Sequence, residues 1–371
     1  MGLDMDRYSR HLRIPEIGQH GQRLISNARI LVVGSGGLGS PALMYLAAAG
    51  VGTIGIVDND VVDLTNLQRQ VLFAESCIGE SKAIQAGNRI RELNSEVNVV
   101  VFDTYLSSHN ALEIFSDFDV VIDATDNFAT RYLINDACIL LGIPYIWGSI
   151  LRFDGQISIF GQVDGPCYRC VYPQPPEPGS VPSCADAGVL GSVCGVIGSM
   201  QATAALNVVM GIGNSLGGSI GIFNALDMTF EKVPIQRNHQ CVACGDAPIL
   251  TELIDYAVWC SASDNSIPLA ELQQLIAEKS AGRTNFTIVD VRESGELMLG
   301  RIPGSIHLPM SALADSNDLV AAVREACGTE PLIFYCKSGY RSGILIEALT
   351  AQGIGDVRHY PGGFDEWNAK A

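Results

Sequence analysis

The chain has 371 residues and a formal net charge of −17, with 23 Lys and Arg against 40 Asp and Glu. This acidic balance argues against nucleic-acid binding as the main role, and no apolar run is long and uninterrupted enough to predict a membrane span. Eleven cysteines, in a chain whose first residues show no signal pattern, predict metal-binding and catalytic thiols in the cytoplasm rather than disulfides. The length favours two domains.

The first elements predict the start of a doubly wound α/β sheet. The apolar run Arg29–Val33 predicts a buried parallel strand, and the glycine-rich turn Gly34–Gly39 follows it. A helix is predicted over Ser40–Ala49, and a second strand over Gly52–Val57 that ends at Asp58. Further helices are predicted over residues 80–93 and 131–141, and further strands over 97–102, 119–123, 144–148 and 156–161.

The glycine-rich turn predicts a nucleotide site. Gly34, Gly36 and Gly37 would let the backbone approach a phosphate, and the helix N-terminus supplies amide donors. Asp58 follows about twenty residues on, where an acid accepts hydrogen bonds from ribose hydroxyls. The turn and Asp58 by themselves also fit a dinucleotide-dependent oxidoreductase, or a tight turn without a ligand.

Polar and cationic residues after the second strand favour nucleotidyl transfer over hydride transfer. Arg69 and Lys82 are candidates for stabilising charge on the α-phosphate and on the departing pyrophosphate, and Asn66 is a candidate polar contact. A dehydrogenase needs no cation at the phosphates beyond the turn. A solvated surface position is the alternative for Arg69 and Lys82.

An acid and an amide follow the predicted strand at 119–123. Asp126 and Asn127 would lie at the carboxyl edge of the sheet, where ligands bind in this class of fold. Asp126 is a candidate for holding Mg²⁺ on a triphosphate, and Asn127 for contacting the nucleotide. A helix N-cap at this position would be compatible with that role.

Two cysteine pairs predict a structural metal site. Cys167 and Cys170 form one Cys-x-x-Cys pair, and Cys241 and Cys244 form the other. Four thiolates are the typical ligands of a closed tetrahedral Zn²⁺ site, which would staple distant segments and leave no open position for catalysis. Four unrelated buried cysteines are the alternative.

The motifs in this order resemble those of the ubiquitin-activating-enzyme-like adenylyltransferases, above all the molybdopterin-synthase and thiamine sulfur-carrier adenylyltransferases. The resemblance covers roughly residues 4–245 and rests on RYSRHLRI, VGSGGLGSP, NLQRQ, Lys82, DATDNFATR and both cysteine pairs. It implies that ATP is used to adenylylate the C-terminal glycine of a small ubiquitin-fold sulfur carrier ending in Gly-Gly. It also implies a homodimer in which Arg10 reaches the neighbouring subunit's ATP. In relatives, a cysteine at the place of Cys184 bonds covalently to the activated carrier; a spectator thiol is the alternative.

The C-terminal part carries a second set of motifs. DVRE, GRIPGSIHLP and CKSGYRS resemble a rhodanese domain over residues 282–371, so residues 1–245 and 282–371 are the expected domains and 246–281 the linker. Cys336 is predicted to end a strand in a loop whose amides, from Lys337 to Arg341, ring the sulfur; the two cations would favour the thiolate. The short loop suits a persulfide. A docking domain without activity is the alternative, although such domains usually lack the cysteine.

These features together predict a Rossmann-like adenylylating domain with structural zinc, followed by a small α/β rhodanese domain. ATP with Mg²⁺ would convert the carrier's terminal carboxylate into an acyl-adenylate, and a persulfide on Cys336 would then supply sulfur to give a thiocarboxylate. The expected sulfur donor is thiosulfate or a cysteine desulfurase. The sequence leaves open whether the carrier serves molybdopterin, thiamine, cysteine or tRNA thiolation. An oxidoreductase and a zinc-stapled docking scaffold are the rival interpretations.

Overall fold

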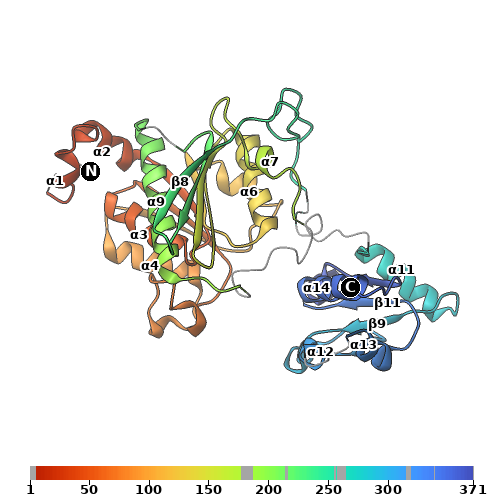
Figure 1. Cartoon of the computed structure of the whole chain (residues 1–371). Coiled ribbons are helices and arrows are strands. Elements are labelled where there is room, and N and C mark those ends of the chain that lie inside the picture. Colours follow the sequence, from red (N-terminus) through yellow and green to blue (C-terminus); the bar gives the residue numbers. More distant parts are fainter. Residues whose placement is uncertain are drawn as a thin grey trace. The chain divides into compact units, whose positions relative to one another are not determined.

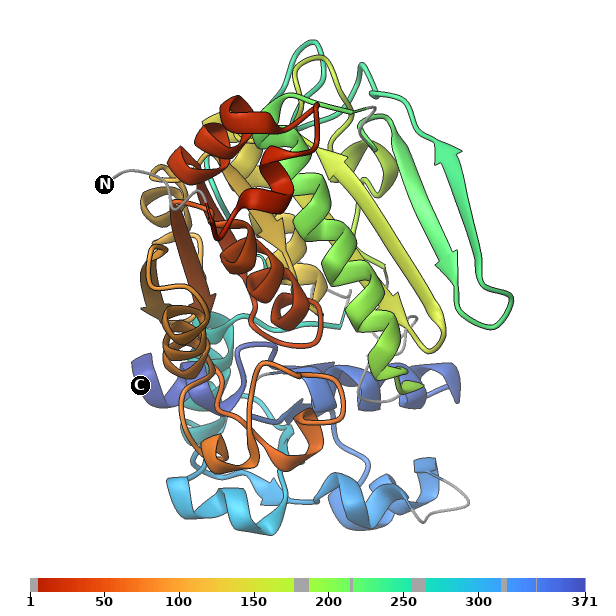
Figure 2. The same ribbon diagram turned by 90° about the vertical axis from the view of Figure 1, so that its left-hand side faces the viewer.

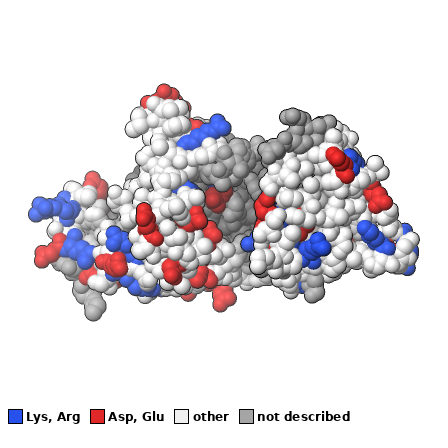
Figure 3. All heavy atoms as spheres, turned by 90° about the horizontal axis from the view of Figure 1, so that it is seen from below, with Lys and Arg blue, Asp and Glu red and all other residues white. Residues whose placement is uncertain are grey.

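The structure is a computed structural model that describes residues 6–176, 187–213, 216–254, 256, 265–314, 319–337 and 339–370. The chain divides into two compact units. The described residues within 6–174 and 187–254 belong to the first unit, and residues 265–370 to the second. On the face shown in Figure 3, acidic and basic side chains are intermingled, and no broad basic patch is visible among the described residues.

The first unit is built around an eight-stranded sheet in the described part of the chain, with strand order β3-β2-β1-β4-β5-β6-β7-β8. The strands are β1 (Arg29–Val33), β2 (Thr53–Asp58), β3 (Asn98–Asp103), β4 (Val120–Asp123), β5 (Tyr145–Leu151), β6 (Asp154–Phe160), β7 (Ser219–Asn224) and β8 (Thr229–Pro234). The first five are parallel, and β1 lies between β2 and β4. The strand order runs outward from β1 to β3 on one side and from β4 to β5 on the other. Doubly wound sheets bind ligands where this order reverses, here between β1 and β4.

Helices cover both faces of this sheet (Figure 1, Figure 2). On one face, α3 (Gly39–Ala49) packs between α4 (Lys82–Leu93) and the long helix α9 (Gly191–Met210), and on the other face lie α6 (Phe128–Leu141) and α7 (Tyr168–Val171). The remaining elements are α1 (Ser9–Leu12), α2 (Gly18–Asn27), α5 (Ala111–Phe115) and the 3₁₀ turns η1 (Leu64–Asn66) and η2 (Glu75–Cys77).

The second half of the sheet differs from a parallel series. β5 and β6 pair antiparallel, as do β6 with β7 and β7 with β8. Only two residues separate Leu151 at the end of β5 from Asp154 at the start of β6. A parallel crossover needs a dozen residues or more, so such a short connection can only make a hairpin. The first unit is therefore Rossmann-like in its first five strands, and its last three strands extend the sheet in antiparallel pairing.

Helix α9 is apolar and rich in glycine, alanine and serine. By length and composition it is the one helix among the described residues that could cross a membrane, a criterion that core helices of globular proteins also meet. It packs against α3, β5 and β6, and buries Val193, Ile197 and Ala205 in the core of the first unit. These contacts assign it to the core of the α/β unit.

The second unit is a smaller α/β domain. Its described strands are β9 (Thr287–Asp290), β10 (Ile306–His307), β11 (Leu332–Tyr335) and β12 (Val357–His359), all parallel, in the order β10-β9-β11-β12. Around them lie α11 (Leu269–Ser280), η3 (Ser294–Leu299), α12 (Met310–Ala314), α13 (Leu319–Cys327), α14 (Tyr340–Ala351) and α15 (Gly363–Lys370).

The segment expected as a linker, residues 246–281, contributes to this second unit. Helix α11 lies within it, and Leu272 of α11 is buried in one core cluster with Ile288 of β9 and Tyr335 of β11. The part of the expected linker that forms α11 therefore belongs to the second unit, because Leu272 packs against the strands of that unit.

Candidate nucleotide and thiol sites

A cavity of about 230 Å³ opens at the carboxyl ends of β1, β2 and β4 in the first unit. Its described walls contain most of the residues predicted to bind ATP, namely Gly34, Gly36, Gly37, Asp58, Arg69, Lys82, Asp126 and Asn127. The parallel strands end at the same edge of the sheet, so these residues from five separate segments meet there. The same walls include Gln70 and Arg131, for which the sequence suggested no role.

The glycine-rich turn lies between β1 and α3 and is tightly packed. Gly34 has φ +92°, and a Cβ there would lie 2.8 Å from the carbonyl oxygen of Ala124 at the end of β4. Both observations require glycine, because other residues rarely adopt this φ and the strand end leaves no room. The turn thus brings backbone amides to the cavity.

Asp58 organises this turn as well as lining the cavity. One of its carboxylate oxygens, Oδ2, accepts hydrogen bonds from the backbone N and the hydroxyl of Ser35, both at 2.8 Å, and Oδ1 accepts from the N of Asp60 at 3.0 Å. A predicted ribose contact would add to these bonds. The carboxylate therefore connects the end of β2 to the glycine-rich turn.

Lys82 is the first residue of α4, and it lines the cavity. Its Nζ lies 2.8 Å from Oδ2 of Asp60, and its side chain is 7% exposed against 71% for the acid. The Nη1 of Arg69 donates to the carbonyl of Thr65 at 3.1 Å. Both predicted cations thus line the cavity, and Asp60 holds one of them in place.

Asp126 and Asn127 separate the two roles that the sequence allowed. The Oδ1 of Asn127 accepts from the backbone N of Thr130 at 2.8 Å, so Asn127 is the N-cap of α6. Asp126 is exposed and lines the cavity, and within the described residues no hydrogen bond occupies its carboxylate. The acid is consequently free to receive a cation.

Three other predicted site residues lie elsewhere or outside the described chain. The Oδ1 of Asn66 accepts from the backbone N of Asp63 at 3.2 Å in a capping box of η1, and Asn66 is not among the described cavity walls. Arg10 is exposed on α1 and is not among the described cavity walls, so its role in a neighbouring subunit stays a prediction. Cys184 lies outside the described residues.

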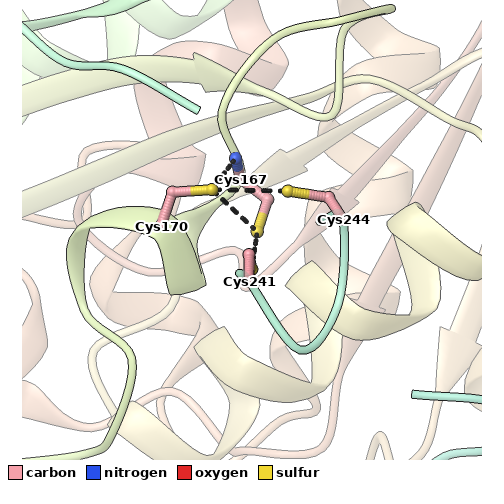
Figure 4. Close-up of side chains that lie close together, drawn as sticks. All are labelled: Cys167, Cys170, Cys241 and Cys244. Carbon is pink, nitrogen blue, oxygen red and sulfur yellow. Dashed lines mark hydrogen bonds between the residues drawn. The ribbon is translucent and has the colours of Figure 1, made fainter. Parts of the chain in front are cut away.

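The two cysteine pairs come together in the first unit (Figure 4). All four Sγ atoms lie within 4.8 Å of one another, with 3.5 Å from Cys167 to Cys241 and 3.3 Å from Cys170 to Cys244. The hydrogen bond with Cys167 lowers the pKa of the Cys170 thiol to about 6.

The donor set fits a metal ion. Four sulfur atoms at these separations match the ligand set of tetrahedral structural sites. The backbone N–H groups of Cys167 and Asn238 also donate to the Sγ of Cys170, at 3.4 and 3.3 Å, and amide donors of this kind stabilise thiolate charge. The cluster would hold a metal with all four thiols and no open position.

The second unit holds one thiol at the end of a strand. Cys336 directly follows β11 and is 1% exposed, and the hydroxyl of Ser342 donates to its Sγ at 3.8 Å. Gly339 starts α14 with φ +83°, and a Cβ there would collide with the carbonyl oxygen of Pro361. The chain is thus tightly turned at Gly339, at the N-terminus of a helix.

Arg341, one of the two cations of this loop, forms an ion pair that the sequence did not indicate. Both terminal nitrogens of Arg341 donate to the carboxylate of Glu296, at 2.6 and 2.7 Å. These bonds lower the pKa of Glu296 to about 2. Arg341 also interacts with Cys336, so its charge is shared between an acid and the thiol. A glutamate 45 residues earlier in the chain carries no local signal for such a pairing.

Comparisons with known proteins agree with both units. A family model described as "ThiF family" matches residues 8–243, and one described as "Rhodanese-like domain" matches residues 269–370. The probable adenylyltransferase/sulfurtransferase MoeZ of Mycobacterium tuberculosis is 41% identical over 98% of this chain and 93% of its own. The sulfur carrier protein adenylyltransferase of Thermus thermophilus is 48% identical over 69% of this chain and 97% of its own.

The fold of the first unit also occurs in a solved structure. The crystal structure of E. coli MccB with MccA-N7isoASN superposes with a TM-score of 0.59 at 22% identity, covering 66% of this chain and 76% of that one. The two units make the chain an enzyme of the adenylyltransferase and sulfurtransferase class. The chain belongs to the ThiF family, and its C-terminal unit is a rhodanese-like domain. Membership of this family implies the use of ATP.

Proposed function

We propose that the first unit adenylylates the C-terminal glycine of a small ubiquitin-fold sulfur carrier ending in Gly-Gly. The observation that carries this proposal is the cavity that unites a glycine-rich turn, the cations Arg69 and Lys82, and the open carboxylate of Asp126. The carrier carboxylate attacks the α-phosphorus of ATP, and the bond to pyrophosphate breaks. Arg69 and Lys82 stabilise the negative charge that builds up on these phosphates.

Asp126 would hold Mg²⁺, which neutralises charge on the triphosphate. Its exposed carboxylate at the cavity supports this role. We assign Zn²⁺ to the four cysteines because an all-thiolate set at tetrahedral spacing is typical of structural zinc. The zinc would connect residues 167–170 to residues 241–244 and would take no part in the reaction.

The second unit would then supply sulfur. A donor, thiosulfate or a cysteine desulfurase, leaves a terminal sulfur on Cys336. This sulfur attacks the acyl carbon of the acyl-adenylate, and AMP departs. A second thiol, for which Cys184 is the candidate, attacks the Cys336 sulfur of the acyl disulfide; the thiocarboxylate leaves and a protein disulfide remains. An external thiol reductant returns both cysteines to the reduced state.

We propose a cytoplasmic homodimer as the working form. The grouping of four cysteines as a candidate metal site, rather than as disulfides, supports a reducing compartment. Arg10, exposed on α1, would complete the cavity of the other subunit.

Carrier-dependent exchange of pyrophosphate into ATP tests the adenylylation. Asp126→Ala should lower this exchange by about a hundredfold or more, because the cation site and its charge compensation are lost. Asp227→Ala, which removes an exposed acid far from the cavity walls, is the matched control and should exchange as wild type does. Full exchange by Asp126→Ala would remove this residue from the mechanism, and no exchange by the wild type with Gly-Gly-ended carriers would overturn the proposed reaction.

A further inference from the structure

Asp126, the acid proposed to hold Mg²⁺, lies between two residues that hydrogen bonds hold in place. On one side, the backbone N of Thr125 donates to Oδ1 of Asp123 at 3.0 Å. On the other side, Asn127 caps α6 by accepting from the backbone N of Thr130 at 2.8 Å. The chain is therefore fixed immediately before and after Asp126, while Asp126 itself is exposed at the cavity.

The side chain of Thr125 makes a second and shorter bond to the same carboxylate oxygen. Its hydroxyl donates to Oδ1 of Asp123 at 2.6 Å, so one oxygen accepts from both the backbone and the side chain of the threonine. The other oxygen, Oδ2, is buried without a hydrogen-bond partner among the described residues. Asp123 is 0% exposed and Thr125 is 9% exposed, so little solvent competes for this bond.

The strand end that carries Asp123 is itself held by the core of the first unit. Gln201 of α9 is fully buried, and its Nε2 donates to the carbonyl of Asp123 at 2.6 Å and to that of Ile146 in β5 at 3.2 Å. The backbone N of the next residue, Ala124, donates to the carbonyl of Val33 in β1 at 2.9 Å. The carboxylate that Thr125 contacts is thus anchored to the sheet and to α9, outside the loop that carries Asp126.

The same threonine also contacts a cation of the cavity. A terminal nitrogen of Arg131, in α6, donates to the carbonyl of Thr125 at 3.4 Å, and both residues line the cavity together with Asp126. Thr125 therefore bonds through its N–H and its hydroxyl to the strand end, and through its carbonyl to the arginine. A residue held in this way keeps its neighbour in one position before a ligand arrives, which reduces the entropy lost on binding.

We propose that Thr125 is a positioning residue for adenylylation, whose hydroxyl, bonded to Asp123, holds the loop between β4 and α6 so that the carboxylate of Asp126 meets the cation of the metal–ATP complex. This inference rests on the proposed function, in which Asp126 holds Mg²⁺. Loss of the hydroxyl should therefore weaken the use of the metal and leave the reaction itself unchanged once the metal is bound.

Thr125→Val in the full-length protein tests the inference, because valine has the shape of threonine and lacks only the hydroxyl. The Mg²⁺ concentration that gives half-maximal carrier-dependent pyrophosphate exchange should rise roughly tenfold, the usual effect of losing one hydrogen bond to a carboxylate. Exchange at saturating Mg²⁺ should return to near the wild-type value. Calorimetric titration with ATP in the absence of carrier gives a readout without turnover: Mg²⁺ should strengthen ATP binding to the wild type roughly tenfold more than binding to the variant.

Two matched variants separate positioning from a general loss of stability. Thr125→Ser restores a hydroxyl and should restore the wild-type Mg²⁺ requirement. Thr53→Val removes the hydroxyl of a threonine that is 8% exposed, at the start of β2, where it accepts from Asn98 at 3.4 Å. Thr53 is not among the described cavity walls, so this variant should keep the wild-type Mg²⁺ requirement even if it melts earlier.

The outcomes that would overturn the inference are distinct from a failure of the proposed function. A wild-type Mg²⁺ requirement in Thr125→Val would overturn it, as would a raised requirement that Thr125→Ser does not repair, or a loss of exchange that saturating Mg²⁺ does not restore. If Thr125→Val does not fold, Thr125→Ala, which lacks the same hydroxyl, takes its place and must show the same change. Absence of exchange in the wild type would instead count against the proposed function.

Discussion

The two cysteine sites of the chain place thiols in opposite surroundings. In the first unit, four Sγ atoms lie within 4.8 Å of one another. In the second unit, Cys336 stands alone at a strand end, with the hydroxyl of Ser342 and the guanidinium of Arg341 as its polar neighbours. Four converging thiols can satisfy a metal completely, whereas a single thiol beside a cation remains a nucleophile.

The difference also appears in how each site is held. The cluster joins segments about seventy residues apart, so its geometry depends on the whole first unit. The Cys336 loop is set by local features: the end of β11, the tight turn at Gly339 and the start of α14. Loss of a cluster cysteine should therefore damage the fold, and loss of Cys336 should damage only chemistry.

The largest expected effect follows from Cys336→Ala. Loading of sulfur on the protein and formation of the thiocarboxylate should fall at least about a hundredfold, because no other residue of the loop is a sulfur nucleophile. Carrier-dependent pyrophosphate exchange should stay near the wild-type value, since its residues lie in the other unit. Intact-mass spectrometry after incubation with a sulfur donor checks this, and the wild type should gain one sulfur.

Cys327→Ala is the matched control for Cys336→Ala. This thiol lies in the same unit, and burial raises its pKa to about 11, so it should carry little thiolate. Sulfur loading in this control should match the wild type. Thiocarboxylate formation by Cys336→Ala would show that the sulfur follows another route, and Cys184 would be the next thiol to test.

A smaller effect, on stability, is expected at the cluster. Cys170→Ser should reduce the metal content below one per chain and lower the melting temperature by about 5 °C or more, because metal binding contributes to the free energy of folding. Elemental analysis and calorimetry measure both quantities. Cys77→Ser, which changes a half-buried thiol outside the cluster, should keep the metal and melt close to the wild type. Unchanged metal content in Cys170→Ser would contradict a four-thiolate site.

The smallest expected effect concerns the acid that pairs with Arg341. The pKa of Glu296 is lowered to about 2 in the folded protein, from an ordinary value of 4.5. The ion pair therefore adds stability that is fully present above about pH 4.5 and is lost as the pH falls toward 2. Glu296→Gln should cost roughly 1 kcal/mol at pH 7, allowing for solvent screening of a partly exposed pair.

This difference should shrink as the solution is made acidic. Melting temperatures of the wild type and Glu296→Gln, recorded between pH 7 and pH 3, should approach each other at the acid end. Glu325→Gln, at an exposed position on α13, is the control and should follow the wild type throughout. A difference that stays constant over this pH range would show that Glu296 acts through something other than its charge.

Much of the nucleotide site could be predicted from local sequence. The apolar run of β1, the turn at Gly34 and the acid at the end of β2 follow each other within thirty residues, so their spacing alone indicates the strand–turn–helix–strand unit. The residues of NLQRQ could be assigned only in part: Arg69 lines the cavity, while Asn66 caps a 3₁₀ turn. A motif shows which side chains could bind a ligand. It does not show which of them form hydrogen bonds within a turn instead, as Asn66 does.

Local sequence by itself determined the α/β class of both units, the glycine-rich turn, the Cys336 loop and the two cysteine pairs, because each depends on residues close together in the chain. Tertiary structure alone decided the pairing of Glu296 with Arg341 and the meeting of the two cysteine pairs at one site. These contacts join residues 45 and 74 positions apart in the chain. Only the packing of the elements brings such side chains within hydrogen-bonding distance, and no periodic pattern in the chain encodes that distance.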